Sequence, residues 1–264
     1  MRHYSELWLL LAISFVFFFV LSIFDGIAIN DSFELRPAGF AEAVFPKQPE
    51  ADAPAAPAVE AVRAAAGPAP TDTTSQTILF IGDSMLDGLS PRMAEYCLQN
   101  GHRLVSVRWY SSSTLKWGKS ARLRELIAAY RPTYIFICLG ANELSIAKVE
   151  EKRGPDIDRI LREVGETPYV WIGPPNWKPD TGINALIARK TAPGSFFLSD
   201  GMSFERRKDG AHPTNESAAQ WLDSVMRWMP AHAAHPIRMS RPDKPLPPKK
   251  PSQIIVKLIQ PNEE

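Results

Sequence analysis

Cysteine is scarce in this sequence, and neither sign of charge is in excess. The 264 residues include 2 cysteines, Cys97 and Cys138, and 30 Lys and Arg against 29 Asp and Glu give a formal net charge of +1. The cysteine spacing is unlike that of a metal site, and it leaves one disulfide and two buried thiols equally open. The balanced charge indicates no preference for nucleic acid.

The sequence also lacks a repeat at a fixed period and an even spread of its apolar residues. Its composition, 45% apolar and 22% charged, is that of an ordinary globular protein. The apolar residues are nevertheless crowded near the amino terminus, and most of the 24 prolines lie outside the middle of the chain. We therefore interpret three regions separately.

An uncharged apolar segment near the amino terminus predicts a membrane anchor. Residues 7–24 contain no charged side chain, and this length can cross a bilayer as a slightly short helix. Arg2 and His3 precede the segment and Asp25 follows it, so the positive-inside rule places the amino terminus in the cytoplasm and the remainder outside. The alternative is a cleavable signal peptide, but the small-x-small triplet Ala41-Glu42-Ala43 lies far beyond the apolar segment.

Two proline-rich regions flank the middle of the chain. Residues 26–76 are rich in Ala and Pro, and we interpret them as an extracytoplasmic linker that follows a cytoplasmic stub and anchor over residues 1–25. Residues 233–264 form a proline-rich, basic tail that contains the apolar segment 254–259. The sequence leaves open whether this tail is disordered, binds a partner or packs on the domain.

The middle region, residues 77–232, alternates short β-like runs with helix-like stretches. Five β-like runs begin at Thr77, Arg103, Thr133, Pro168 and Ser195. Because these runs are continuously apolar, they indicate parallel strands covered on both faces. We expect one α/β domain with a three-layer α/β/α arrangement around a five-stranded parallel sheet.

Polar groups follow each of these strands. The segments that follow them are Gly82-Asp83-Ser84, residues 110–118, Gly140-Ala141-Asn142-Glu143, residues 173–178, and the last loop with Asp209 and His212. Because the carboxyl ends of parallel strands share one edge, we expect these groups to converge on one crevice. Residues 173–178 and Trp117 are candidates for its wall.

Ser84 is a candidate nucleophile in this crevice. A serine hydroxyl is a poor nucleophile near neutral pH and needs a base that is itself oriented by a third group. His212 can be that base, and Asp209, three residues earlier, can fold back onto its imidazole. Taken alone, Ser84 followed by Asp87 also fits a helix cap, and His212 before Pro213 also fits a surface turn.

Attack by a serine on an ester would develop a negative oxygen that needs hydrogen-bond donors. Three donors are candidates: the Ser84 N–H, a backbone N–H within residues 112–114, and the Asn142 amide, which carries no charge to repel the oxyanion. Asn142 alone would more often be a turn former. Asp83 and Glu143 have no obvious role in this scheme.

Together, these residues resemble the motif blocks of the SGNH (GDSL-like) hydrolase family. Gly82-Asp83-Ser84 is similar to its first block, Gly140-Ala141-Asn142-Glu143 to its third, and Asp209-Gly210-Ala211-His212 to its last. The resemblance spans residues 77–230 and implies a flavodoxin-like fold. It further implies Ser84 as nucleophile, His212 as base, Asp209 as its partner and Asn142 in the oxyanion hole, with no cofactor and no catalytic metal.

Two positions depart from the family pattern. The second block usually has a glycine whose N–H joins the oxyanion hole, whereas this sequence has Ser113 or Thr114 there. We take Thr114 as that donor, with Ser113, Asp83 and Glu143 as supporting residues. The third block ends in Glu143 where Asp is commoner. The GDSM form, the anchor and the spacer are similar to envelope-glycan members, which remove or transfer O-acetyl groups.

The sequence thus predicts a single-pass protein of the bacterial inner membrane with a periplasmic serine O-acyl esterase or acyltransferase domain. Its substrate would be an O-acylated, most simply O-acetylated, glycan or another acyl ester. Water as the final acceptor would make it an esterase, and a sugar hydroxyl would make it a transferase. A transferase would depend on a membrane partner that brings acyl groups across the bilayer.

Two other classes of function fit some of these residues. A metal-dependent hydrolase would bind Mg²⁺ or Mn²⁺ through hard ligands at the same edge, namely Asp83, Asp87, Asn142, Glu143, Asp209 and His212. A non-catalytic glycan-binding module on the same fold would account for the changed second block. Neither class requires serine, asparagine and Asp-x-x-His at these strand ends, so we favour the serine enzyme.

Overall fold

The computed structural model describes residues 27–30, 33–35, 69–245 and 252–260, in two compact units, Met1–Pro57 and Ala58–Glu264. In the first unit, strands β1 (Ile27–Asn30) and β2 (Phe33–Leu35) pair antiparallel. The expected anchor over residues 7–24 lies outside the described residues. Within the described ranges, no helix combines the length and apolarity needed to cross a membrane.

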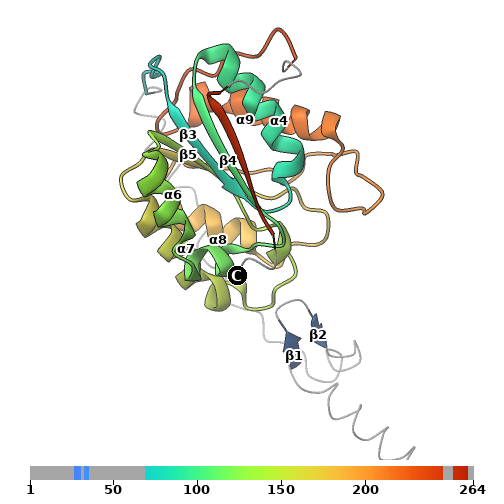
Figure 1. The fold of residues 1–264 in the computed structure, drawn as a ribbon. Coiled ribbons are helices and arrows are strands. Elements are labelled where there is room, and N and C mark those ends of the chain that lie inside the picture. Colours follow the sequence, from blue (N-terminus) through green and yellow to red (C-terminus); the bar gives the residue numbers. More distant parts are fainter. Residues whose placement is uncertain (1–26, 31–32, 36–68, 246–251, 261–264) are drawn as a thin grey trace, which may run out of the picture. The chain divides into compact units, whose positions relative to one another are not determined.

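The second unit is built on a parallel sheet (Figure 1). In spatial order its strands are β7 (Phe196–Phe197), β6 (Tyr169–Ile172), β5 (Tyr134–Cys138), β3 (Thr77–Gly82), β4 (Arg103–Trp109) and β8 (Ile254–Ile259). Every neighbouring pair among them is parallel. This confirms the expected α/β class and places all the carboxyl ends of these strands at one edge.

The expectation of five strands was wrong, because β8 adds a sixth. This strand comes from the apolar segment that we assigned to the tail, and it pairs with β4 from Leu104↔Ile254 to Trp109↔Ile259. Ile254 and Ile259 are buried, whereas Lys257 and Leu258 are exposed. These six residues, of which five are apolar, lie far along the chain from the other strands. Their sequence does not indicate the strand with which they pair, so only the folded chain shows that β8 belongs to the sheet.

Helices cover both faces of the sheet (Figure 1). On one face lie α4 (Leu86–Asn100) and α9 (Asn215–His232). On the other lie α5 (Thr114–Lys119), α6 (Arg122–Tyr130), α7 (Val149–Val164) and α8 (Ile183–Lys190). Ile78 and Phe80 of β3 pack in the first core and Leu79 and Ile81 in the second, as the two-residue period of a strand requires.

The two cysteines are free thiols rather than a disulfide. Cys97 lies in α4 and Cys138 at the end of β5, and both are buried. Burial raises the pKa of both thiols, and for Cys138 the nearby Asp83 carboxylate raises it further. They therefore act as small apolar groups of the core.

The first turns of α4 and α9 pack closely, which requires a residue without a side chain. A Cβ at Gly88 would lie 2.4 Å from the Ala218 Cβ. We predict that Gly88→Ala destabilises the protein by about 1–3 kcal/mol, the usual cost of overpacking. Gly154→Ala in α7 is the control, since the new Cβ would meet the flexible end of Lys190 at 3.3 Å.

Thermal unfolding of the two variants measures this difference. The Gly154→Ala melting temperature should fall less than that of Gly88→Ala, because the higher helix propensity of alanine, about 0.5–1 kcal/mol, offsets part of the cost of a Cβ before Pro155. The Gly88→Ala value should fall by several degrees. Equal melting temperatures for the two variants would contradict the close α4–α9 contact.

Candidate active site

Three candidate residues meet at the carboxyl edge of the sheet. Ser84 follows β3, Asn142 lies in a short 3-10 helix, η1 (Ala141–Glu143), after the adjacent strand β5, and His212 precedes α9. The His212 Nε2 atom lies 2.8 Å from the Ser84 Oγ atom, and His212 Nδ1 lies 2.9 Å from Asp209 Oδ2. Serine, histidine and aspartate therefore form one hydrogen-bonded chain.

The Ser84 side chain does not cap helix α4. The helix begins at Leu86, and its N-cap Met85 makes no side-chain capping bond. The backbone forms a tight turn in which the Asp87 N–H donates to the Ser84 carbonyl at 3.0 Å. The hydroxyl is thus left for His212, and it is half-buried at the base of the helix.

Asp209 holds the His212 ring in one orientation. Its Oδ1 atom accepts the N–H groups of Ala211 and His212, both at 2.9 Å, while Oδ2 faces the ring. These bonds, the His212 N–H first, lower the pKa of Asp209 to about 2. An ionised carboxylate at Nδ1 favours a proton on that nitrogen, so Nε2 is left to accept the Ser84 proton.

Two of the three expected oxyanion donors have an N–H that is not used within the part of the protein that the structure describes. The Asn142 side chain is anchored by donating from Nδ2 to the Ser112 carbonyl at 2.8 Å, and an amide group carries a second N–H. Among the described residues, the Ser84 N–H has no protein acceptor. Both groups follow neighbouring strands of the sheet, β3 and β5, and their role as donors to an oxyanion stays a prediction.

Thr114 does not supply the third donor, which corrects the sequence expectation. Its N–H donates to Glu143 Oε2 at 2.9 Å and its hydroxyl to Oε1 at 2.6 Å, and the residue is fully buried. Ser113 is the N-cap of α5, where its hydroxyl accepts the Lys116 N–H. Within the described part of the chain, the Ser113 N–H has no protein acceptor.

Glu143 is a buried carboxylate that holds the segment carrying Asn142 in place. It is 1% exposed, accepts both Thr114 bonds, and forms an ion pair with Arg153 of α7, with Nε and Oε1 2.8 Å apart. Burial raises the pKa of this carboxyl, while Thr114 and Arg153 lower it. Glu143 thereby fixes η1, and with it Asn142, to α5 and α7.

Asp83 is a second buried carboxyl, directly before the candidate nucleophile. Its Oδ1 atom accepts the Met85 N–H at 2.9 Å, and Oδ2 has no partner among the described residues. Burial raises the pKa of Asp83 to about 7, and the neighbouring Glu143 carboxylate also raises it, against the Met85 bond. Asp83 shapes the turn after β3 and has no contact with His212 in the structure.

The tryptophans expected in the crevice wall have different positions. Trp117 is fully buried and donates from its indole to the Ser112 hydroxyl at 3.0 Å, so it supports the loop rather than lining a crevice. Trp177 is half-buried, donates to the Ala141 carbonyl at 3.1 Å, and carries the Lys178 ammonium 4.6 Å from its ring centre. Trp177 thus lies next to η1, which contains Asn142.

Two residues have roles at the site that the sequence does not indicate, since Ser112 enters the sequence prediction only within a segment that could supply a backbone N–H. Ser112 anchors Asn142 and Trp117, and Arg153 pairs with Glu143. A serine in a serine-rich segment and an arginine within a polar helix are both ordinary at the level of sequence. Their roles follow only from the packing of α5 and α7, where a Cβ at Gly118 would lie 2.7 Å from the Asp156 carbonyl oxygen.

Two of the carboxylates considered as metal ligands already have other partners. Glu143 binds Thr114 and Arg153, and Asp87 forms ion pairs with Arg108 and Arg207. In the described ranges, no group of three or more His, Cys, Asp and Glu side chains is arranged to hold a metal ion. Glu143 and Asp87 thus already have cationic partners within the protein.

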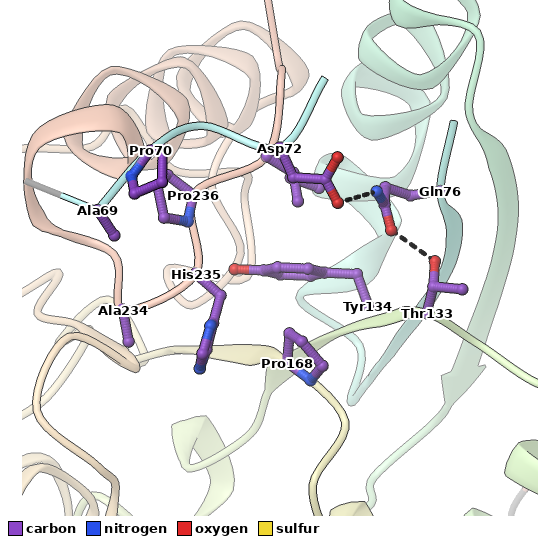
Figure 2. A pocket seen from close by; sticks show the side chains of 11 residues that line it. Ala69, Pro70, Asp72, Gln76, Thr133, Tyr134, Pro168, Ala234, His235 and Pro236 are labelled. Carbon is purple, nitrogen blue, oxygen red and sulfur yellow. Dashed lines mark hydrogen bonds between the residues drawn. The ribbon is translucent and has the colours of Figure 1, made fainter. Parts of the chain in front are cut away.

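A cavity of about 260 Å³ lies at the opposite edge of the sheet (Figure 2). It surrounds Tyr134 and Thr133 at the start of β5, with Pro168, His235 and Pro236 on its sides. Candidate residues of the active site are not among those that line it. The site is instead an open arrangement in which Asn142 and Asp209 are exposed.

Comparison with known proteins finds similar solved structures but no matching family model or curated protein. Among solved structures, TesA is similar over 58% of this chain and 97% of its own, with 23% identity and a TM-score of 0.44. The psychrotrophic esterase EstA from Pseudoalteromonas sp., inhibited by monoethylphosphonate, covers the same shares with 19% identity and a TM-score of 0.42.

Asp83 makes stability depend on pH. Its carboxyl pKa is about 7 in the folded protein against about 4 when unfolded, so the folded state binds more protons between these values. The contribution of Asp83 therefore favours folding at low pH and is lost as pH rises from about 4 to about 7. We predict that Asp83→Asn removes this loss and is more stable than wild type at pH 8 by roughly 1–4 kcal/mol.

Urea unfolding at pH 5 and pH 8 tests this prediction. The difference in free energy of unfolding between Asp83→Asn and wild type should grow as the pH rises. Asp158→Asn serves as the control, because Asp158 lies on the surface of α7 in an ion pair with Lys190. A difference between Asp83→Asn and wild type that is the same at both pH values would show that Asp83 titrates normally.

Proposed function

We propose that this protein is a serine esterase or acyltransferase that acts on O-acyl groups. The observation that carries the proposal is the hydrogen-bonded chain from Ser84 through His212 to Asp209, with both contacts to the ring at 2.8–2.9 Å. This arrangement meets the requirements of nucleophilic catalysis, namely a hydroxyl, a base within reach and a group that orients the base.

The first half of the reaction would transfer an acyl group to Ser84. As Oγ bonds to the ester carbonyl carbon, its proton passes to His212 Nε2, and Asp209 stabilises the imidazolium that forms. The carbonyl oxygen becomes negative and accepts the Ser84 N–H and the free N–H of Asn142. When the carbonyl re-forms, the ester bond breaks, and the leaving alkoxide takes the proton from His212.

The second half would remove the acyl group. His212 takes a proton from an incoming hydroxyl, which bonds to the acyl carbon while the bond to Ser84 Oγ breaks and the proton returns to that oxygen. Water as the incoming group completes an esterase cycle and a sugar hydroxyl a transferase cycle. The exposure of Asn142 and Asp209 leaves room for an acceptor as large as a sugar.

We further propose that the acyl group is acetyl and that it is carried by a cell-envelope or exported polysaccharide. The uncharged segment 7–24 and the Ala/Pro-rich linker support a domain tethered outside the inner membrane, in the periplasm. The half-buried Trp177, with Lys178 over its ring, lies beside Ala141 and so next to Asn142, which supports a sugar-binding surface there. A transferase would receive its acyl groups from a membrane partner.

Turnover of an aryl acetate by the full-length protein in detergent tests the proposed chemistry. We predict that Ser84→Ala and His212→Ala each lower kcat by at least about 10³-fold. Asn142→Ala should lower it by about 10²–10³-fold, the usual effect of one oxyanion donor. Ser224→Ala, at a half-buried serine of α9 whose hydroxyl donates to the Gln220 carbonyl, is the control and should leave kcat unchanged.

The outcomes separate the rival functions. Chelator-sensitive turnover that survives Ser84→Ala would indicate a metal-dependent hydrolase. Glycan binding without turnover would indicate a binding module. With a glycan acceptor present, acetylated glycan formed at the expense of free acetate would identify a transferase, and acetate release from an O-acetylated glycan would identify an esterase.

A further inference from the structure

Asp87 has no role in the reaction described above, yet it is closely held next to the site. Its carboxylate forms an ion pair with Arg108 at the end of β4, and the Tyr110 hydroxyl donates to its Oδ1 atom at 3.4 Å. Arg207 contacts the other oxygen, with Nη1 and Oδ2 3.4 Å apart. Two guanidinium groups thus converge on one carboxylate that is only 30% exposed.

Asp87 is fixed relative to Ser84 by the backbone. The two residues share the turn that opens α4, in which the Asp87 N–H donates to the Ser84 carbonyl at 3.0 Å. The neighbouring Gly88 packs against Ala218 at the start of α9. A displacement of the Asp87 side chain would therefore also displace the backbone of Ser84.

Arg207 is fixed in the same way relative to His212. Its N–H donates to the His212 carbonyl at 2.8 Å, and the adjacent Arg206 and Pro213 form an antiparallel bridge. The side chain of Arg207 also donates from Nη2 to Asn215 Oδ1 at 2.9 Å. Arg207 and His212 therefore move as one hairpin.

The tip of this hairpin is exposed. Lys208, Asp209 and Gly210 all lie at the surface, and the Asp209 bonds that orient the ring are internal to the hairpin. The Arg206 side chain supports the hairpin by donating to the Ala211 and Asn176 carbonyls. The Asp87–Arg207 contact joins the hairpin to the turn that carries Ser84.

We propose that Asp87 and Arg207 are positioning residues that hold the His212 ring within hydrogen-bond distance of the Ser84 hydroxyl. Arg108 supports them by fixing the Asp87 carboxylate from the side of β4. The pair is partly buried, so it is screened less by water and salt than a surface pair. This inference rests on the proposed serine chemistry, but its geometry can be tested separately from turnover.

Kinetics of Asp87→Asn, Arg207→Gln and the double variant form the first test, with an aryl acetate as substrate. A displaced base slows the chemical step, so each single variant should lower kcat by about 10–100-fold with KM nearly unchanged. Because the two side chains act as one contact, the double variant should lose little more than either single variant. Asp158→Asn, which breaks the Lys190 ion pair between α7 and α8, should leave kcat unchanged.

Three outcomes would overturn the proposal. A rise in KM at unchanged kcat would assign Asp87 and Arg207 to substrate binding. Multiplying losses in the double variant would show that the two residues act independently. The third outcome is a fall in the thermal unfolding midpoints of Asp87→Asn and Arg207→Gln that matches their loss of activity and is equally large in Asp158→Asn. It would indicate a general loss of stability.

Histidine ¹⁵N NMR of the full-length protein supplies a readout that needs no turnover. Ser84→Ala defines the Nε2 chemical shift of His212 without its serine partner. In Asp87→Asn and Arg207→Gln the Nε2 shift should move from the wild-type value toward that reference, while a wild-type shift in both variants would refute the positioning role. If the wild type has no esterase or transferase activity, the proposed function fails, and this measurement still decides the inference.

Discussion

The hydrogen bond between Ser84 and His212 joins residues 128 positions apart in the sequence. The rest of the fold has to hold these two side chains within bonding distance. The contact tolerates only a few tenths of an ångström, because a base that is displaced by about 1 Å loses most of its effect on the chemical step. Ser84 and Asn142 lie at the same edge of the sheet because they follow two parallel strands, β3 and β5. His212 is different, since it comes from an exposed hairpin rather than from a strand end.

Two buried carboxyl groups next to the site help to hold its backbone in place. Glu143 fastens the loop of Asn142 to α5 and α7 through Thr114 and Arg153, and it does so with a carboxylate that burial disfavours. Asp83 lies next to it with one oxygen unpaired. Such groups cost stability in a low-dielectric core, and they lie where the backbone has to be held in one conformation. The buried carboxyl groups therefore make this edge of the sheet rigid at a cost to the stability of the fold.

The described chain beyond α9 belongs to the architecture of the domain. Ile237 and Met239 are buried in the core of the α4–α9 face, and β8 closes the side of β4 that would otherwise be unpaired. An edge strand is prone to pair with other chains, and β8 now carries that edge with Lys257 and Leu258 exposed. A segment that reads as a basic, proline-rich tail thus contains a structural strand.

The sequence by itself determined the α/β class, the parallel strands and the residues that follow them, because apolar runs and strand ends are local patterns. It also placed Ser84 and Asn142 on one edge, since strand direction decides that, whereas the position of Asp209 and His212 depends on a hairpin that follows no strand end. It could not show that the Thr114 N–H is taken by Glu143, that Trp117 is buried, or that β8 is a strand of the sheet. Each of those depends on which distant groups pack together, and such contacts leave no periodic trace along the chain. Tertiary structure alone decided them.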